Sequence, residues 1–232
     1  AESLVTPDGV QLAALATNSG TIIADGGTVV LSAAAAKGVV HDVVNMSGIV
    51  QARTVVERAG EIILGGGDEG IVRVAGTLDA SGDDSGESGG TVKVLGEKVG
   101  LFAGAHVDVS GDAGGGTALI GGNFQGGGSE PNALRTYFDG DATINADAVT
   151  SGDGGTVIVW ADETTRYAGN ISARGGANSG DGGFVEVSGK EFLDFHGLVD
   201  TSADFGDSGM LLLDPKNITI AGSPSGGGDA NL

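Results

Sequence analysis

The hydrophobic positions of this 232-residue chain recur in a five-residue frame: small residue, any residue, aliphatic residue, any residue, small residue. Successive copies of the frame begin 28, 28, 29, 37, 27 and 28 residues apart. The seven copies are Gly20–Ala24, Gly48–Ala52, Gly76–Ala80, Ala105–Val109, Ala142–Ala146, Gly169–Ala173 and Gly197–Thr201. A repeat of this length predicts a stacked array, because each unit can bury its apolar face only against its neighbours.

A second frame has the alternation of a β-strand, with apolar residues two positions apart. Its copies are Gly27–Leu31, Gly90–Val94, Gly116–Ile120, Gly155–Val159, Gly183–Val187 and Gly209–Leu213. Lys93 and Glu186 lie between inward-facing valines, so we expect both side chains to face solvent. Ile158 and Leu212 break the alternation and predict outer faces that are covered.

A third, weaker strand pattern occurs at 99–102, 165–167 and 192–195. Three short strands and three glycine-rich corners in about 28 residues predict an all-β fold, a parallel β-helix with three strands per coil. Equivalent residues of stacked coils then form columns. We expect a buried aliphatic column of Ile22, Val50, Leu78, Val107, Ile144, Ile171 and Val199, and a small-residue column at a crowded corner of Ala24, Ala52, Ala80, Ala146 and Ala173.

The domain organisation follows from the repeat. We predict a single solenoid over 1–222 and a Gly/Ser-rich flexible tail or linker over 223–232. The one step of 37 residues, from Ala105 to Ala142, predicts an insertion around 121–139. Since the ends of a β-stack offer unpaired strands, end-to-end self-association is a possible mode of assembly.

Composition narrows the function classes. Glycine is frequent (46 residues) and proline rare (4), which favours tight corners between strands over a collagen-like chain. The net charge of −20 argues against a nucleic-acid or anionic-membrane partner. The absence of cysteine excludes disulfides and thiolate chemistry. No apolar run is long enough to predict a membrane span.

Acidic residues cluster just before the second frame, among them Asp83, Asp84, Glu87, Asp153 and Asp181. Two interpretations are open. The carboxylates could bind calcium as a ladder at one corner of the coil. Alternatively, they form a solvated acidic edge that prevents lateral aggregation. We predict no cofactor apart from this possible calcium.

A candidate carbohydrate-binding site combines Trp160 with Asn123 and Gln125 from the predicted insertion. Trp160 follows a strand of inward-facing valines, and such a tryptophan either offers a platform to a sugar ring or covers a hydrophobic stack. Polysaccharide lyases also use β-helices, with carboxylates for calcium and a basic residue as general base. The eleven Lys and Arg residues show no cluster along the sequence, so we expect no enzyme.

Three Asn-x-Ser/Thr sequons, at Asn45, Asn170 and Asn217, are candidate glycosylation sites. Asparagine is also common at corners, where its side chain bonds backbone groups, so the sequons alone do not decide between the two roles.

Longer segments resemble a known family. They are Val44–Ala52, Gly154–Asp162, Thr165–Gly176, Asp181–Lys190 and Gly209–Ile220. In this order they are similar to the filamentous-haemagglutinin-like exoproteins of two-partner secretion, which include the high-molecular-weight adhesins. The Gly-Gly-Phe-Val-Glu-Val-Ser-Gly and Leu-Leu-Leu-Asp-Pro segments are the most specific parts of the match, which extends over nearly the whole chain.

The resemblance implies a right-handed parallel β-helix, export through an outer-membrane β-barrel partner, and a secreted or cell-surface location. It also implies adhesion or biofilm function, with a glycan or a host or matrix receptor as possible partner. The family's Asn-Pro-Asn-Leu secretion motif is absent, so we expect a segment downstream of the secretion domain. The predicted function is therefore the β-helical shaft of an adhesin or matrix fibre, with a carbohydrate-binding module and a lyase as alternatives.

Overall fold

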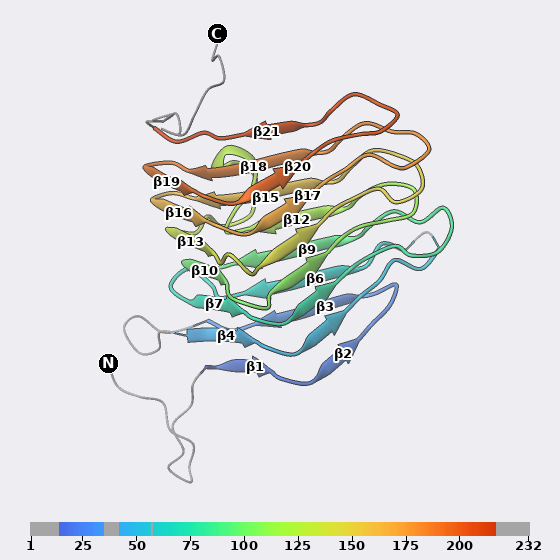
Figure 1. The fold of residues 1–232 in the computed structure, drawn as a ribbon. Coiled ribbons are helices and arrows are strands. Elements are labelled where there is room, and N and C mark those ends of the chain that lie inside the picture. Colours follow the sequence, from blue (N-terminus) through green and yellow to red (C-terminus); the bar gives the residue numbers. More distant parts are fainter. Residues whose placement is uncertain (1–13, 35–41, 57, 217–232) are drawn as a thin grey trace.

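The computed structural model describes residues 14–34, 42–56 and 58–216; the predicted tail and Asn217 lie outside this part of the chain. The chain forms three parallel sheets of seven strands, and each coil contributes one strand to each sheet. Figure 1 shows the coils rising from the N-terminal to the C-terminal end in a right-handed sense. The predicted parallel β-helix is therefore confirmed.

Sheet 1 contains the weakest of the three predicted strand patterns. Its strands, in spatial order, are β1 (Ala16–Asn18), β4 (Asp42–Met46), β7 (Ile71–Val74), β10 (Lys98–Leu101), β13 (Arg135–Phe138), β16 (Thr164–Tyr167) and β19 (Phe192–Phe195).

Sheet 2 contains the five-residue frame. Its strands are β2 (Thr21–Ile23), β5 (Ile49–Gln51), β8 (Thr77–Asp79), β11 (His106–Asp108), β14 (Thr143–Asn145), β17 (Asn170–Ser172) and β20 (Leu198–Asp200).

Sheet 3 contains the alternating second frame. Its strands are β3 (Thr28–Ser32), β6 (Glu61–Gly65), β9 (Thr91–Leu95), β12 (Thr117–Ile120), β15 (Thr156–Ala161), β18 (Phe184–Gly189) and β21 (Met210–Leu212). One short 3-10 helix, η1 (Phe124–Gly126), lies in the connection from β12 to β13. Within the described residues, no helix is long and apolar enough to cross a membrane.

The predicted aliphatic column is confirmed as a continuous ladder through sheet 2. Each of its seven residues is the register partner of the next, from Ile22 to Val199. Val50, Leu78 and Val107 are fully buried. Ile22 and Val199 are only partly buried because they occupy the two end coils of the ladder. Full burial of such a side chain contributes about 1.5–3 kcal/mol, so the column supplies much of the stability of the stack.

A second internal column, in sheet 1, is aromatic towards the C-terminal end. The rings of Phe138 and Tyr167 are 4.9 Å apart, and those of Tyr167 and Phe195 are 5.0 Å apart. The Tyr167 hydroxyl donates a 2.6 Å hydrogen bond to the carbonyl oxygen of Leu198. Burial raises the pKa of Tyr167, and the hydroxyl therefore stays protonated as a donor inside the stack.

A glycine column at the entry to sheet 3 brings successive coils into close contact. A Cβ atom on Gly155 would lie 2.3 Å from the carbonyl oxygen of Gly116, and one on Gly183 would lie 2.1 Å from that of Gly155. Both distances are below 3.0 Å, closer than a Cβ atom comes to a backbone oxygen in folded proteins. Glycine is therefore required here by the spacing of the coils themselves.

The longer connection over 121–134 accounts for the single long step in the repeat; the predicted insertion, 121–139, contains it together with β13. It follows β12 and covers part of the outer face of sheet 3. Ile158 is buried there, as predicted from its break in the alternation, whereas Leu212 is partly exposed.

We predict that Gly183→Ala destabilises the chain by about 1–3 kcal/mol, because the added methyl group forces neighbouring coils apart. Urea unfolding followed by circular dichroism measures this. Gly140→Ala is the matched control, since the nearest heavy atom to its Cβ would be 3.9 Å away. Equal stability of the two variants would contradict the close-contact explanation.

Candidate ligand-binding surface

The outer face of sheet 1 carries two columns of outward-pointing side chains, set by strand register. One column runs Asn45, Arg73, Gly100, Tyr137, Arg166, Asp194. The second runs Ile71, Lys98, Arg135, Thr164, Phe192. Residues between the columns, such as Val72 and Thr136, are buried, so the alternation of each strand separates core from surface.

Gly100 leaves a gap in the first column, and the ring of Phe102 fills it. A Cβ atom on Gly100 would lie 2.4 Å from Cε2 of Phe102, so no larger residue fits beneath the ring. The guanidinium carbon of Arg73 lies 3.9 Å from the centre of that ring. Tyr137 lies on the other side, with ring centres 5.4 Å apart and the planes inclined by 44°. Cation and rings therefore form one continuous stack across three coils.

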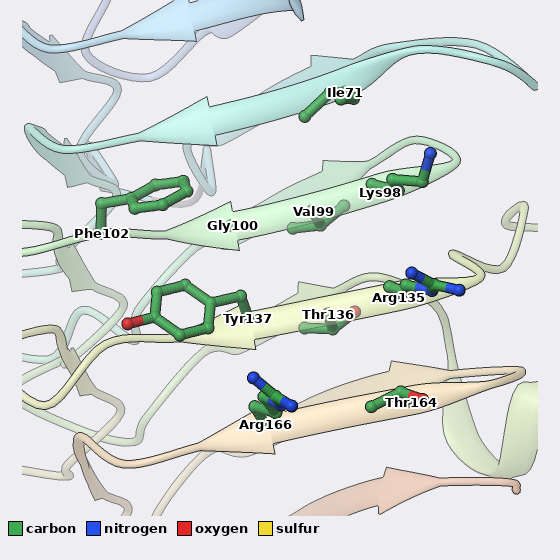
Figure 2. Close-up of a pocket in the computed structure, with 10 residues that line it drawn as sticks. All are labelled: Ile71, Lys98, Val99, Gly100, Phe102, Arg135, Thr136, Tyr137, Thr164 and Arg166. Carbon is green, nitrogen blue, oxygen red and sulfur yellow. The ribbon is translucent and has the colours of Figure 1, made fainter. Parts of the chain in front are cut away.

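A hollow of about 540 Å³ opens between these side chains (Figure 2). In Figure 2 the two rings lie at the carboxyl ends of β10 and β13, whereas Lys98 and Arg135 lie at the opposite ends of the same strands. Gly100, Thr136 and Thr164 also contribute to the lining. The hollow thus combines two aromatic faces with cations at its border.

Four of the eleven Lys and Arg residues gather here, which corrects the expectation that the basic residues show no cluster. Arg135 pairs with Glu163 at 3.2 Å at an exposed position, and Lys98 pairs with Glu97 at 3.7 Å at a partly buried one. Within the described part of the chain, Arg73 and Arg166 make no ion pair. We call the set the basic–aromatic surface; it consists of Arg73, Lys98, Phe102, Arg135, Tyr137 and Arg166.

Tyr137 is held in place at the edge of the hollow. Its hydroxyl donates a 2.8 Å hydrogen bond to Oδ2 of Asp139, and this bond raises the pKa of the Tyr137 hydroxyl. Oδ1 of Asp139 accepts the backbone N–H of Asp141 at 3.1 Å, and these two donors lower the pKa of Asp139. Tyr137 is 39% exposed as a residue, so its positioned side chain is accessible to solvent.

The predicted carbohydrate-binding residues lie away from this surface: Trp160 is on β15 of sheet 3, and Asn123 and Gln125 are in the 121–134 connection. Trp160 is only 3% exposed and packs with Leu119 and Ile158. A Cβ on Gly126 would lie 2.7 Å from its ring, so the 121–134 connection rests directly on the indole. Of the two interpretations of Trp160, the covering of a hydrophobic stack fits this burial.

Asn123 and Gln125 mainly organise the connection itself. Oδ1 of Asn123 accepts the backbone N–H of Phe124 at 2.7 Å and so caps η1. Gln125 has a positive φ of 51°, and its side chain donates to Asp214 at 3.4 Å. Gln125 and Trp160 also border a second hollow of about 480 Å³, next to Lys190 and Asp214. A ligand for Asn123, Gln125 and Trp160 remains a prediction.

Glu186 corrects a prediction: it is fully buried rather than facing solvent. The 121–134 connection covers it, and the backbone N–H of Gln125 donates to its Oε2 at 3.0 Å. Its other oxygen, Oε1, has no hydrogen-bond partner among the described residues. Burial is the main cause that raises the pKa of Glu186, and the nearby charge of Asp214 adds to it.

Lys93, expected to face solvent like Glu186, keeps a partly exposed side chain. It lies between Glu61 at 3.4 Å and Glu130 at 3.3 Å. Glu130 belongs to the 121–134 connection, so this pair ties the connection to β6 and β9.

The acidic residues proposed for calcium bind main-chain groups of neighbouring coils. Asp153 accepts the backbone N–H of Asp181 at 2.8 Å, and Asp181 accepts that of Asp207 at 2.8 Å. In the part of the chain that the structure describes, no three acidic or histidine side chains come together to hold a metal ion. These carboxylates therefore act as links between coils.

The remaining predicted calcium residues lie in one earlier corner. Glu87 is buried and accepts the backbone N–H groups of Val56 and Asp84. Asp83 pairs with Arg53 at 3.2 Å. Sequence proximity suggested a common ligand set, but Glu87 and Asp83 each have their own protein partner, and calcium binding here remains a prediction.

The sequons differ in accessibility. Asn170 is exposed on β17, and Asn45 is partly buried on β4, in the same outward column as Arg73. Asn217 lies outside the described residues. Glycosylation at these positions remains a prediction.

Comparison with known proteins finds similar solved structures. The crystal structure of the HMW1 secretion domain from Haemophilus influenzae is similar to this chain, with 32% sequence identity and a TM-score of 0.69. The likeness covers 85% of this chain and 49% of that structure, so the chain spans about half the length of the solved domain. No family model matches the sequence, and no curated protein does.

The match supports a family related to the two-partner secretion adhesins. It can also be compared with the position that we expect for this segment. The sequence predicted a place downstream of the secretion domain, whereas the similar structure is itself a secretion domain. Because the likeness covers 49% of that structure, the position of this segment in its full-length protein remains a prediction.

We predict that Glu186→Gln stabilises the chain at pH 7, because glutamine carries no charge into the buried site. A carboxyl whose folded-state pKa is raised contributes stability below its unfolded value, near 4.5, and loses it as pH rises through the folded value. The advantage of Glu186→Gln should therefore shrink on acidification towards pH 4.5.

Urea unfolding at a series of pH values measures this effect, with the exposed Glu191→Gln as the matched control. A wild-type chain as stable as Glu186→Gln at pH 7, or an advantage that grows in acid, would contradict the assignment.

Proposed function

We propose that this chain is a β-helical segment of a secreted bacterial surface protein, in which the stacked coils form an extended, non-enzymatic shaft. The observation that carries the proposal is the unbroken ladder of three parallel sheets from β1 to β21. A solenoid of this kind grows in one direction by adding coils, so its natural physical role is to extend and display surface.

The comparison and the family resemblance support export as well. The similar solved structure is described as a secretion domain, and the sequence resembles exoproteins of two-partner secretion. On this proposal the full-length protein crosses the outer membrane through a β-barrel partner and remains on or near the cell surface. Adhesion to a host or matrix receptor, biofilm formation and end-to-end association of copies are the functions that such a shaft would serve.

A carbohydrate-binding role is the second candidate, and the observation that favours it is the basic–aromatic surface on sheet 1. The polysaccharide lyase hypothesis has no comparable observation in its favour, and we do not propose it.

We expect the full-length protein to be exposed on intact cells of its source organism. Antibodies against the chain and protease treatment of intact cells would detect it, with a periplasmic protein as the control for cell integrity. Deletion of the outer-membrane partner should abolish surface labelling. Retention of the protein in the cytosol of wild-type cells, or unchanged export without the partner, would contradict the proposal.

A further inference from the structure

We propose that the basic–aromatic surface binds an acidic polysaccharide that carries carboxylate or sulfate groups and lies along the β-helix axis. The inference does not depend on the route of export, because it rests on the side chains of sheet 1 alone.

The charge distribution is the first argument. The chain carries a net charge of −20, yet three of its eleven cations, Lys98, Arg135 and Arg166, line one hollow, and a fourth, Arg73, lies over the Phe102 ring at its border. Arg73 and Arg166 form no ion pair within the described residues, and Asp194, which follows Arg166 in the column, contacts His196 at 2.9 Å. A guanidinium group binds planar or tetrahedral oxyanions through paired N–H donors, so both groups are available to anionic substituents of a ligand.

The aromatic rings are the second argument. Phe102 and Tyr137 lie side by side at the outer surface, where burial in the core does not explain them. A pyranose ring presents C–H groups on its faces and oxygen atoms at its edges. Aromatic faces with a few placed polar groups are the usual lining of a ligand site. Here the rings can pack against the C–H faces of a sugar, and the polar groups can bond the oxygen atoms at its edges.

The direction of the column is the third argument. Arg73, Phe102, Tyr137 and Arg166 come from four successive coils, and neighbouring coils are spaced about 4.8 Å apart. A ligand aligned with the axis therefore meets a cation, two rings and a second cation in turn. A single sugar would contact only some of these four side chains, whereas an extended polymer could contact all of them.

A nucleic-acid strand also combines negative charge with stacking groups, but its charge density is less compatible with this molecule. One phosphate follows another about every 3.4 Å along a strand, and each would experience the repulsion of the strongly acidic remainder of the chain. An acidic polysaccharide can place its charges at the local cations and neutral hydroxyls elsewhere.

Isothermal titration calorimetry of the whole chain tests the proposal. The probes are polygalacturonate, which carries carboxylates, and dextran sulfate of low substitution, which carries sulfates spaced along an otherwise neutral polymer, with neutral dextran as the matched polymer. We expect at least one acidic polysaccharide to bind, added salt to weaken the binding, and dextran not to bind. Which of the two binds identifies the preferred anion.

A double variant locates the site. Tyr137→Ala with Arg166→Ala should weaken binding by about tenfold or more, since it removes one ring and one unpaired cation. The matched control, Phe205→Ala with Arg58→Ala, removes an exposed ring and an exposed cation away from sheet 1 and should bind like the wild-type chain. Both variants change exposed side chains, and circular dichroism and urea unfolding verify that each is folded.

Three results would overturn the proposal. One is the absence of binding to both acidic polysaccharides. The second is equal loss of binding in the two double variants. The third is equal or tighter binding of poly-L-glutamate or an oligothymidylate strand, which would show that charge alone, or a nucleic acid, is what the surface recognises.

Discussion

Main-chain hydrogen bonding between successive coils is the interaction on which the rest of this structure depends. Every strand pairs in parallel with its equivalent one coil away, so a residue at one position of the repeat lies against the same position of the next coil. This register allows aliphatic residues to form a buried ladder in sheet 2. It also requires glycine where backbones meet, as at Gly155 and Gly183.

The same register acts on the outer surface. Arg73, Tyr137 and Arg166 are far apart in the sequence, yet the pairing of β7, β10, β13 and β16 sets them in one column. The small size of Gly100 then admits the ring of Phe102. A candidate ligand surface thus arises from the coil spacing and does not require an inserted loop or a separate domain. The carboxylates of Asp153 and Asp181 use the same spacing to bond backbone groups of the next coil.

Much of the core could be predicted from the sequence because it depends on local alternation and a regular step. The column from Ile22 to Val199 required only a count of residues between frames. The basic–aromatic surface was missed because β7 and β13 were not recognised, and without them the cations cannot be aligned. The burial of Glu186 could not be predicted either, since it depends on the path of the 121–134 connection over sheet 3. The path of this connection is set by tertiary contacts and does not recur in the other coils, so the repeat pattern does not predict it.

The most direct measurement of the central claim compares two internal deletions, one that keeps the coil register and one that breaks it. Removal of 48–75 takes out one complete coil and brings the frame at Gly20 against the frame at Gly76. Removal of 48–61 takes out about half a coil, so buried strand positions of one coil would stack against corner positions of the next. If coil register governs the fold, circular dichroism and urea unfolding will show a cooperative β-structure for the first deletion and its loss for the second. Similar stability of the two deletions, or loss of structure in both, would contradict this account.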